Sequence, residues 1–139
     1  MYEILLPVDD DEDRAATQTA HVVDLPLRAD EVRVTLTHVL HGAEKRAPEP
    51  MRTPQRVGTV RQARDQLEDV GIAVRILEAG APPAQGILEL AAEVDADLIV
   101  LGGRKRSATA KVVFGSTTQQ VIRETDLPVT VTGGASPGE

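Results

Sequence analysis

Two short segments in the C-terminal half of the chain combine glycine with hydroxyl side chains. Asp97–Gly102 is an apolar run that ends in glycine, and after twelve intervening residues Gly115 is followed by Ser116, Thr117 and Thr118. This order predicts a buried strand, a long connection and the start of a helix. The first N–H groups of a helix have no partner within it and can bind a phosphate. The alternative is that the hydroxyl groups only cap the helix.

Cationic side chains gather in the connection between these two segments. Arg104, Lys105, Arg106 and Lys111 are four of the 15 basic residues of the chain. A cationic cluster beside a helix N-terminus favours phosphate binding. The alternative is a solvated loop whose charge offsets nearby acidic residues.

An acidic run follows the first apolar segment of the chain. Residues 9–13 read Asp-Asp-Asp-Glu-Asp. The carboxylates of residues 11–13 are typical of the first turn of a helix, where they oppose the helix dipole favourably. Asp9 ends the preceding strand, so we expect it to face a ligand. The run would repel a triphosphate, unless Mg²⁺ bridges one or two carboxylates and the phosphate oxygens.

Apolar runs alternate with helical patterns along the chain, which is typical of βαβ units and a parallel sheet. The expected strands cover residues 2–8, 31–40, 72–78, 97–101 and 128–132, and the expected helices cover about 12–23, 54–70 and 83–94 and begin again near 116. Val70 is expected to complete the apolar stripe of the second helix, and Gly71 to end that helix. Residues 41–53 are expected to form a loop. Right-handed crossovers cover both faces of such a sheet, which predicts a three-layer α/β sandwich.

Length and composition restrict the class of protein. A chain of 139 residues predicts one domain, residues 1–132, with a flexible tail over 133–139. No apolar run reaches the length of a membrane span and no signal region opens the sequence, so we expect a cytoplasmic protein without a membrane partner. A net charge of −7 argues against nucleic acid as a partner. The lack of cysteine and the scatter of three histidines argue against a metal site.

The charged residues are also unusual in kind. Arginine occurs 12 times and lysine three times among the basic residues, while Asp and Glu together number 22. This bias resembles that of proteins from halophilic archaea. An ordinary acidic protein from a GC-rich genome is the alternative, because net charge informs mainly on solubility and association.

Together, these segments resemble the universal stress protein family. Members of this family carry a glycine, two residues, a glycine, nine residues, a glycine and then serine or threonine. Gly102, Gly115 and Ser116 match this pattern, whereas Lys105 stands in place of the middle glycine. The resemblance implies a Rossmann-like sheet of five parallel strands in the order 3-2-1-4-5, similar to that of the adenine nucleotide alpha hydrolases. Its ligand crevice would open between strands one and four.

The resemblance also implies a ligand and its contacts. The ligand would be an adenine nucleotide, ATP with Mg²⁺ as a possible companion. The residues that would contact it are Pro7, Val8, Asp9, Val39, Gly102, Gly103, Arg104, Lys105, Gly115, Ser116, Thr117 and Thr118. Lys105 either obstructs the approach of the ligand or holds its phosphate as a cation. A homodimer through strand 128–132 is implied as well, and the uncharged, β-branched sequence of this strand supports a covered sheet edge.

The predicted function is nucleotide binding in stress response or signalling. The chain has no Gly-x-Ser-x-Gly elbow, no Walker loop and no paired histidine motif, so we expect at most slow ATP hydrolysis. The alternative is a nucleotide-free homodimeric interaction module in which Lys105 and the acidic turn have abolished the pocket. A receiver domain is a third, weaker candidate. It requires an aspartate after strand three and a lysine after strand five, where this chain has Glu78 and Gly133.

Overall fold

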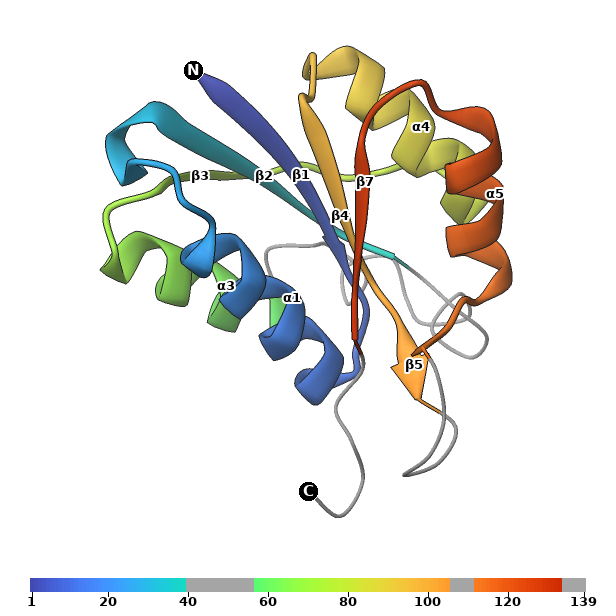
Figure 1. Ribbon diagram of the computed structural model, residues 1–139, viewed down its shortest axis with the longest axis horizontal. Coiled ribbons are helices and arrows are strands. Elements are labelled where there is room, and N and C mark those ends of the chain that lie inside the picture. Colours follow the sequence, from blue (N-terminus) through green and yellow to red (C-terminus); the bar gives the residue numbers. More distant parts are fainter. Residues whose placement is uncertain (40–56, 106–111, 134–139) are drawn as a thin grey trace.

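The computed structural model describes residues 1–39, 57–105 and 112–133. Within them, five parallel strands form one sheet in the order β3-β2-β1-β4-β7 (Figure 1). The strands are β1 (Tyr2–Val8), β2 (Val32–His38), β3 (Ala73–Ile76), β4 (Leu98–Gly102) and β7 (Val129–Thr132). Since β7 is the fifth of the expected strands, the predicted order 3-2-1-4-5 is confirmed.

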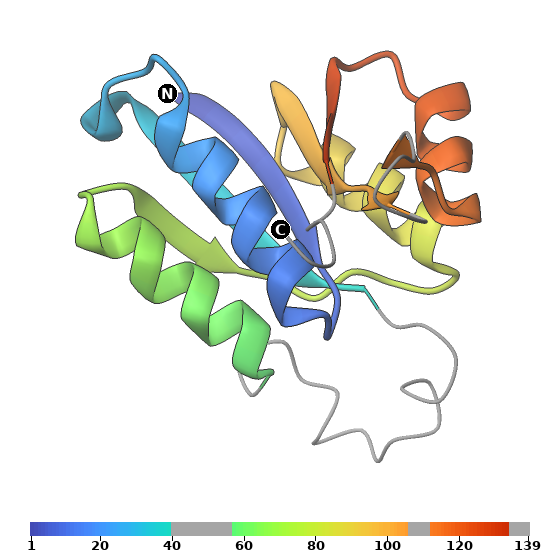
Figure 2. The ribbon, with the colours of Figure 1, turned by 60° about the horizontal axis from the view of Figure 1, so that its bottom comes forward.

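Helices cover both faces of this sheet and complete the expected three layers. Figure 2 shows α1 (Glu12–Asp24) and α3 (Gly58–Asp69) on one face, and α4 (Pro83–Glu93) and α5 (Ser116–Glu124) on the other. Alternation along β1 supplies both cores. Ile4, Leu6 and Val8 pack in the α1 and α3 layer, whereas Leu5 packs in the α4 and α5 layer.

The second expected helix differs from its prediction at both ends. It begins at Gly58, and the expected start at Pro54 lies outside the described residues. It ends at Asp69, so Val70 forms the C-cap and is 45% exposed instead of completing the buried stripe. Gly71 does end the helix, because its φ of 87° places it in the left-handed region that glycine adopts without strain.

Two expected strands are shorter than predicted. A 3₁₀ turn over Ala29–Glu31 precedes β2 and delays its start, and β3 ends at Ile76 because its pairing with β2 stops there. The expected loop over residues 41–53 lies outside the described residues, and so does the expected tail beyond Gly133.

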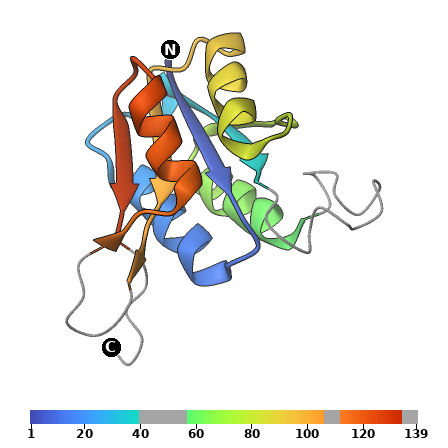
Figure 3. The same cartoon turned by 90° about the vertical axis from the view of Figure 1, so that its right-hand side faces the viewer.

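A two-stranded hairpin extends from the sheet at the end of β4, where the sequence predicted only a loop. Strands β5 (Arg104–Lys105) and β6 (Val112–Val113) pair antiparallel, with Arg104 opposite Val113 and Lys105 opposite Val112. Figure 3 shows the short strands leading away from β4 and back toward α5. The hairpin therefore carries two residues of the predicted cationic cluster and returns the chain to the start of α5.

Candidate functional site

A pocket lies at the carboxyl ends of β1 and β4, where parallel α/β sheets commonly bind ligands. Residues from both helical layers and from three strands or their ends line it: Pro7, Asp9, Arg14, Gln18, Val39, Ile87, Leu101, Gly102, Gly115, Ser116, Thr117 and Thr118. The two loops that the sequence singled out, after β1 and between β4 and α5, therefore meet at one site.

The pocket exists because β1 and β4 separate before they end. Their pairing comprises Ile4 with Leu98 and Leu5 with Ile99. Beyond these pairs, Gln18 of α1 bridges the two strands. Its Nε2 donates to the carbonyl oxygen of Pro7 at 2.7 Å and to that of Val100 at 3.3 Å. The Gln18 side chain is almost fully buried and forms the floor of the crevice.

Asp9 lies in the turn after β1, and its carboxylate is bound on both oxygens. Its Oδ1 accepts from the backbone N–H of Asp11 at 2.9 Å, and its Oδ2 accepts from Nη1 of Arg14. The hydroxyl of Thr59 donates to the backbone carbonyl of Asp9 at 2.7 Å, which fixes the turn to α3. The pocket thus contains a carboxylate whose charge a neighbouring guanidinium offsets.

The other carboxylates of the acidic run are directed elsewhere. Asp11 is the N-cap of α1 and accepts from the backbone N–H of Arg14 at 2.9 Å, while Glu12 and Asp13 lie in the first turn. Asp10 pairs with the buried His38, with 2.9 Å between Oδ1 and Nε2. Among the described residues of this run, only Asp9 lines the pocket.

The N-terminus of α5 forms another part of the pocket lining. Gly115 is its N-cap, no side-chain hydrogen bond caps the helix, and the first turn carries no acidic residue. Capping therefore does not account for the Gly-Ser-Thr-Thr sequence. Ser116, Thr117 and Thr118 line the pocket, and a Cβ on Gly115 would meet nothing within 4 Å. Backbone N–H groups and the positive end of the helix dipole are available here to an anion.

The remaining part of the lining is apolar. Val39, Ile87 and Leu101 belong to the hydrophobic core beneath α4 and α5, and Pro7 adds its ring beside them. The pocket lining therefore combines apolar side chains with hydroxyl and N–H groups and with the side chain of Arg14. This combination suits a ligand that joins an aromatic ring to an anionic group.

Comparison with known proteins identifies the family and its fold. A family model described as the universal stress protein family matches residues 1–133. The chain belongs to the universal stress protein family. A solved universal stress protein from Archaeoglobus fulgidus is 30% identical, with a TM-score of 0.75 over 95% of this chain and 98% of that one. Another solved structure from the same archaeon, in complex with dAMP, is 25% identical, with a TM-score of 0.71 over 95% and 98% of the two chains.

The sequence of this chain also aligns with part of a bacterial stress response protein. The stress response protein NhaX of Bacillus subtilis is 33% identical over 89 residues, which are 61% of this chain and 52% of NhaX. The aligned part thus spans about half of that relative.

Most of the predicted contacts of this universal stress protein lie together at the pocket. Eight of the twelve line it: Pro7, Asp9, Val39, Gly102, Gly115, Ser116, Thr117 and Thr118. Two others do not. The side chain of Val8 points into the core beneath α1 and α3, because neighbouring residues of a strand face opposite sides. Gly103 is buried against β7, where its N–H donates to the Thr132 carbonyl at 2.9 Å. Arg104 and Lys105 follow in β5.

Sequence reasoning missed four lining residues: Arg14, Gln18, Ile87 and Leu101. A signal for Gln18 was present, because the buried face of α1 runs through Ala15, Gln18, Thr19 and Val22. A glutamine within such a stripe requires buried hydrogen-bond partners. Arg14 carries no comparable signal, since a charged residue in a first helical turn is usually exposed.

Metal clusters and membrane spans are both absent from the residues that the structure describes. There, no three His, Asp or Glu side chains come close enough together to hold a metal ion. No helix among them has both the length and the apolar character of a membrane span.

Proposed function

We propose that this universal stress protein binds an adenine nucleotide, ATP, in the crevice between β1 and β4. The observation that carries the proposal is the N-terminus of α5, which lacks a side-chain cap and an acidic first turn and lines the pocket together with apolar side chains. The phosphates would accept from the N–H and hydroxyl groups of Ser116 and Thr117, and the base would pack against Val39 and Ile87. The structure from Archaeoglobus fulgidus with dAMP supports the choice of an adenine nucleotide.

Binding, and not catalysis, is the proposed activity, with a role in stress response or signalling. Asp9 is the one carboxylate among the described lining residues, and Arg14 already occupies it. A carboxylate held in this way is a poor general base for activating water. Mg²⁺ accompanies ATP in this proposal through the phosphate oxygens, because that ion keeps much of its water shell.

The test is calorimetric titration of the wild-type protein with ATP and Mg²⁺, beside the variants Ser116→Glu and Ser116→Gln. Ser116 is exposed at the first position of α5, so both side chains fit there. A glutamate at this position interacts favourably with the helix dipole but places a negative charge beside the phosphates. We expect Ser116→Glu to bind ATP about tenfold more weakly than Ser116→Gln, which matches it in size. No binding by the wild type at millimolar ATP would refute the proposal and leave the nucleotide-free interaction module.

We also propose that the protein forms a homodimer through β7. This strand pairs with β4 on one side and is last in the sheet order, so its other edge has no partner among the described residues. The carbonyls of Pro128 and Thr132 accept from the β4 strand and its end. The backbone N–H and C=O groups of successive strand residues point to opposite edges, so the N–H of Val131 points to the free edge of β7. A second copy joined about a two-fold axis would pair with that edge.

Two further proposals concern the location of the protein and the salt concentration in which it works. The protein would work in the cytoplasm, and its net charge of −7 with few lysines would suit a high internal salt concentration. Both rest on the sequence.

A further inference from the structure

We propose that Arg14 makes the pocket selective for nucleotides over nucleosides. Its guanidinium would release Asp9 and bind the phosphate of an incoming nucleotide. The inference rests on the proposed nucleotide site and adds a residue to it. Three observations carry it: the place of the Arg14 side chain, its ion pairs, and the charge that it leaves in the pocket.

Arg14 reaches the pocket because Gly102 leaves room for its stem. A Cβ on Gly102 would lie 2.5 Å from Cγ and 2.6 Å from Cδ of Arg14, and 2.9 Å from Oε1 of Gln18. The Arg14 side chain is therefore packed between α1 and the end of β4, and 17% of it is exposed. Arg14 lines the same pocket as Ser116 and Thr117 at the start of α5.

The ion pairs of Arg14 differ in strength. Nη1 binds Asp9, whose side chain is 14% exposed, and Nη2 lies 3.5 Å from Oδ2 of the half-exposed Asp11. The second contact is long and screened by solvent, so it contributes little. A guanidinium has five N–H donors in a planar fork, and these two contacts leave donors for a phosphate.

The pair with Asp9 determines what kind of ligand gains from entering. Without Arg14, Asp9 would place a negative charge near the start of α5, where the phosphates are proposed to bind. The positive charge of Arg14 offsets that negative charge. When a nucleotide binds, the ribose hydroxyls can donate to Asp9 while Arg14 turns to the phosphate, so that both charges keep a partner. A nucleoside brings no anion, and Arg14 then stays on Asp9 and competes with the ribose. The move of Arg14 from Asp9 to the ligand thus strengthens the binding only of ligands that carry a phosphate.

The experiment compares the dissociation constants of adenosine, AMP and ATP for the wild type, Arg14→Gln and Asp9→Asn. Arg14→Gln is expected to weaken AMP and ATP about tenfold or more, since a hydrogen bond to a charged group is lost only for the phosphates. Adenosine should bind as well as to the wild type or somewhat more tightly, because the guanidinium no longer competes with the ribose for Asp9. Asp9→Asn removes a ribose acceptor and frees the guanidinium, so it should shift the ratio of adenosine to AMP affinity in the opposite direction.

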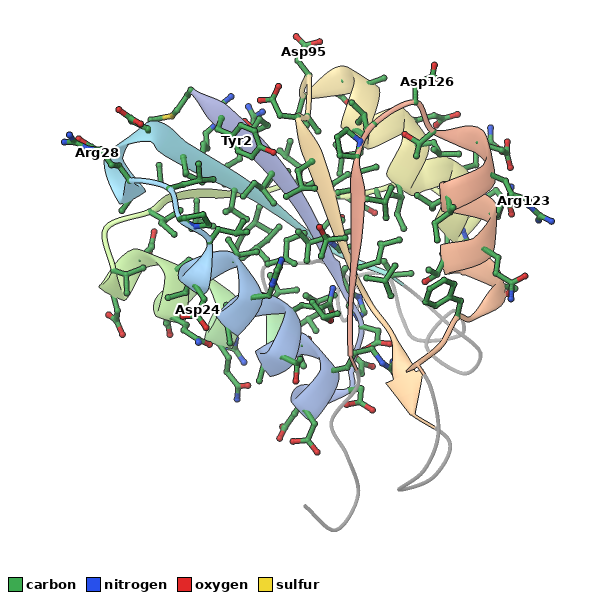
Figure 4. All side chains as sticks on the ribbon, viewed as in Figure 1. Tyr2, Asp24, Arg28, Asp95, Arg123 and Asp126 are labelled. Atoms are coloured by element: carbon green, nitrogen blue, oxygen red, sulfur yellow. The ribbon has the colours of Figure 1, made fainter. Side chains whose placement is uncertain are left out.

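Arg28→Gln is the matched control. Arg28 forms an ion pair with Asp30, is largely exposed, and points away from the molecule at the opposite end of the sheet from the pocket (Figure 4). Arg28→Gln changes the net charge by the same amount as Arg14→Gln and should leave all three dissociation constants unchanged. Urea unfolding of each variant shows that it is folded at the temperature of titration.

The outcomes separate this inference from the proposed function. A wild type that binds none of the three ligands refutes the nucleotide site, and the inference with it. A wild type that binds them, with Arg14→Gln changing adenosine and AMP by the same factor, refutes the inference alone. Tighter binding of all three ligands by Arg14→Gln also refutes it, because the arginine would then obstruct the pocket.

Discussion

Gly86 of α4 lies against the backbone of the turn that precedes this helix, and Gly86→Ala should destabilise the protein. A Cβ at this position would lie 2.0 Å from the carbonyl oxygen and 2.7 Å from the carbonyl carbon of Gly80. Real Cβ contacts are essentially not found below 3.0 Å, so the turn or the helix must move by about an ångström. The turn is also tied to the helix by the N–H of Gly86, which donates to the Pro82 carbonyl at 2.9 Å.

The expected free energy follows from two opposing effects. Overpacking costs about 1–3 kcal/mol, and the upper end applies because the clash is with backbone and not with a flexible side chain. Alanine regains about 1 kcal/mol of helix propensity over glycine. The unfolding free energy of Gly86→Ala should therefore fall by about 2 kcal/mol.

Gly58→Ala is the control for this experiment. Gly58 opens α3, and a Cβ there would meet nothing within 4 Å. This variant should be more stable than the wild type by about 0.4–1 kcal/mol, because alanine lowers the entropy of the unfolded chain without a clash. Urea unfolding followed by far-ultraviolet circular dichroism measures both. If Gly86→Ala is as stable as the wild type, the close approach of the turn to α4 is wrong.

Three further predictions concern the proposed ligand, the dimer and the salt response. Lys105→Gly should weaken ATP binding in calorimetry if the lysine holds a phosphate, and tighter binding would show that it obstructs. Val131→Pro should give a monomer in light scattering at a concentration where Val131→Ala, which loses similar packing but keeps the edge N–H, remains a dimer; a dimer in both would exclude β7 as the interface. The melting temperature should rise from dilute buffer to molar KCl as repulsion at a net charge of −7 is screened, and a flat or falling value would favour the ordinary acidic protein.

The strands were predictable because burial imposes simple patterns on them. The apolar runs of residues 2–8 and 97–101 were placed within one residue, since a central parallel strand is covered on both faces. Their order in the sheet came from the family resemblance, because local patterns carry no information on which strands pair. The hairpin of β5 and β6 was missed for a related reason. Strands of two residues are too short to show periodicity.

The lining of the pocket was predictable at the start of α5, where glycine and backbone groups form it, and less predictable where side chains of α1 form it. Glycine and hydroxyl residues at the start of α5 mark a helix end in the sequence itself. Val8 was assigned to the pocket with its neighbours Pro7 and Asp9, although strand alternation turns its side chain to the opposite face. Arg14 and Gln18 were missed because a polar residue in a helical pattern is normally assigned to solvent, and their partners are strand ends that only the tertiary fold brings near.

The separation of β1 and β4 has a mechanical consequence. Arg14 and Gln18 come from the α1 layer, whereas Ile87 and Ser116 come from the α4 and α5 layer, and all four border the same opening. Past Leu5 and Ile99 the two strands are linked through the amide of Gln18 and not by direct pairing. A ligand bound in the opening would contact both helical layers at the place where β1 and β4, the strands between them, are no longer paired. Its presence would then slow hydrogen exchange on both surfaces of the domain together, so that a partner docked on either surface could detect whether the opening is filled.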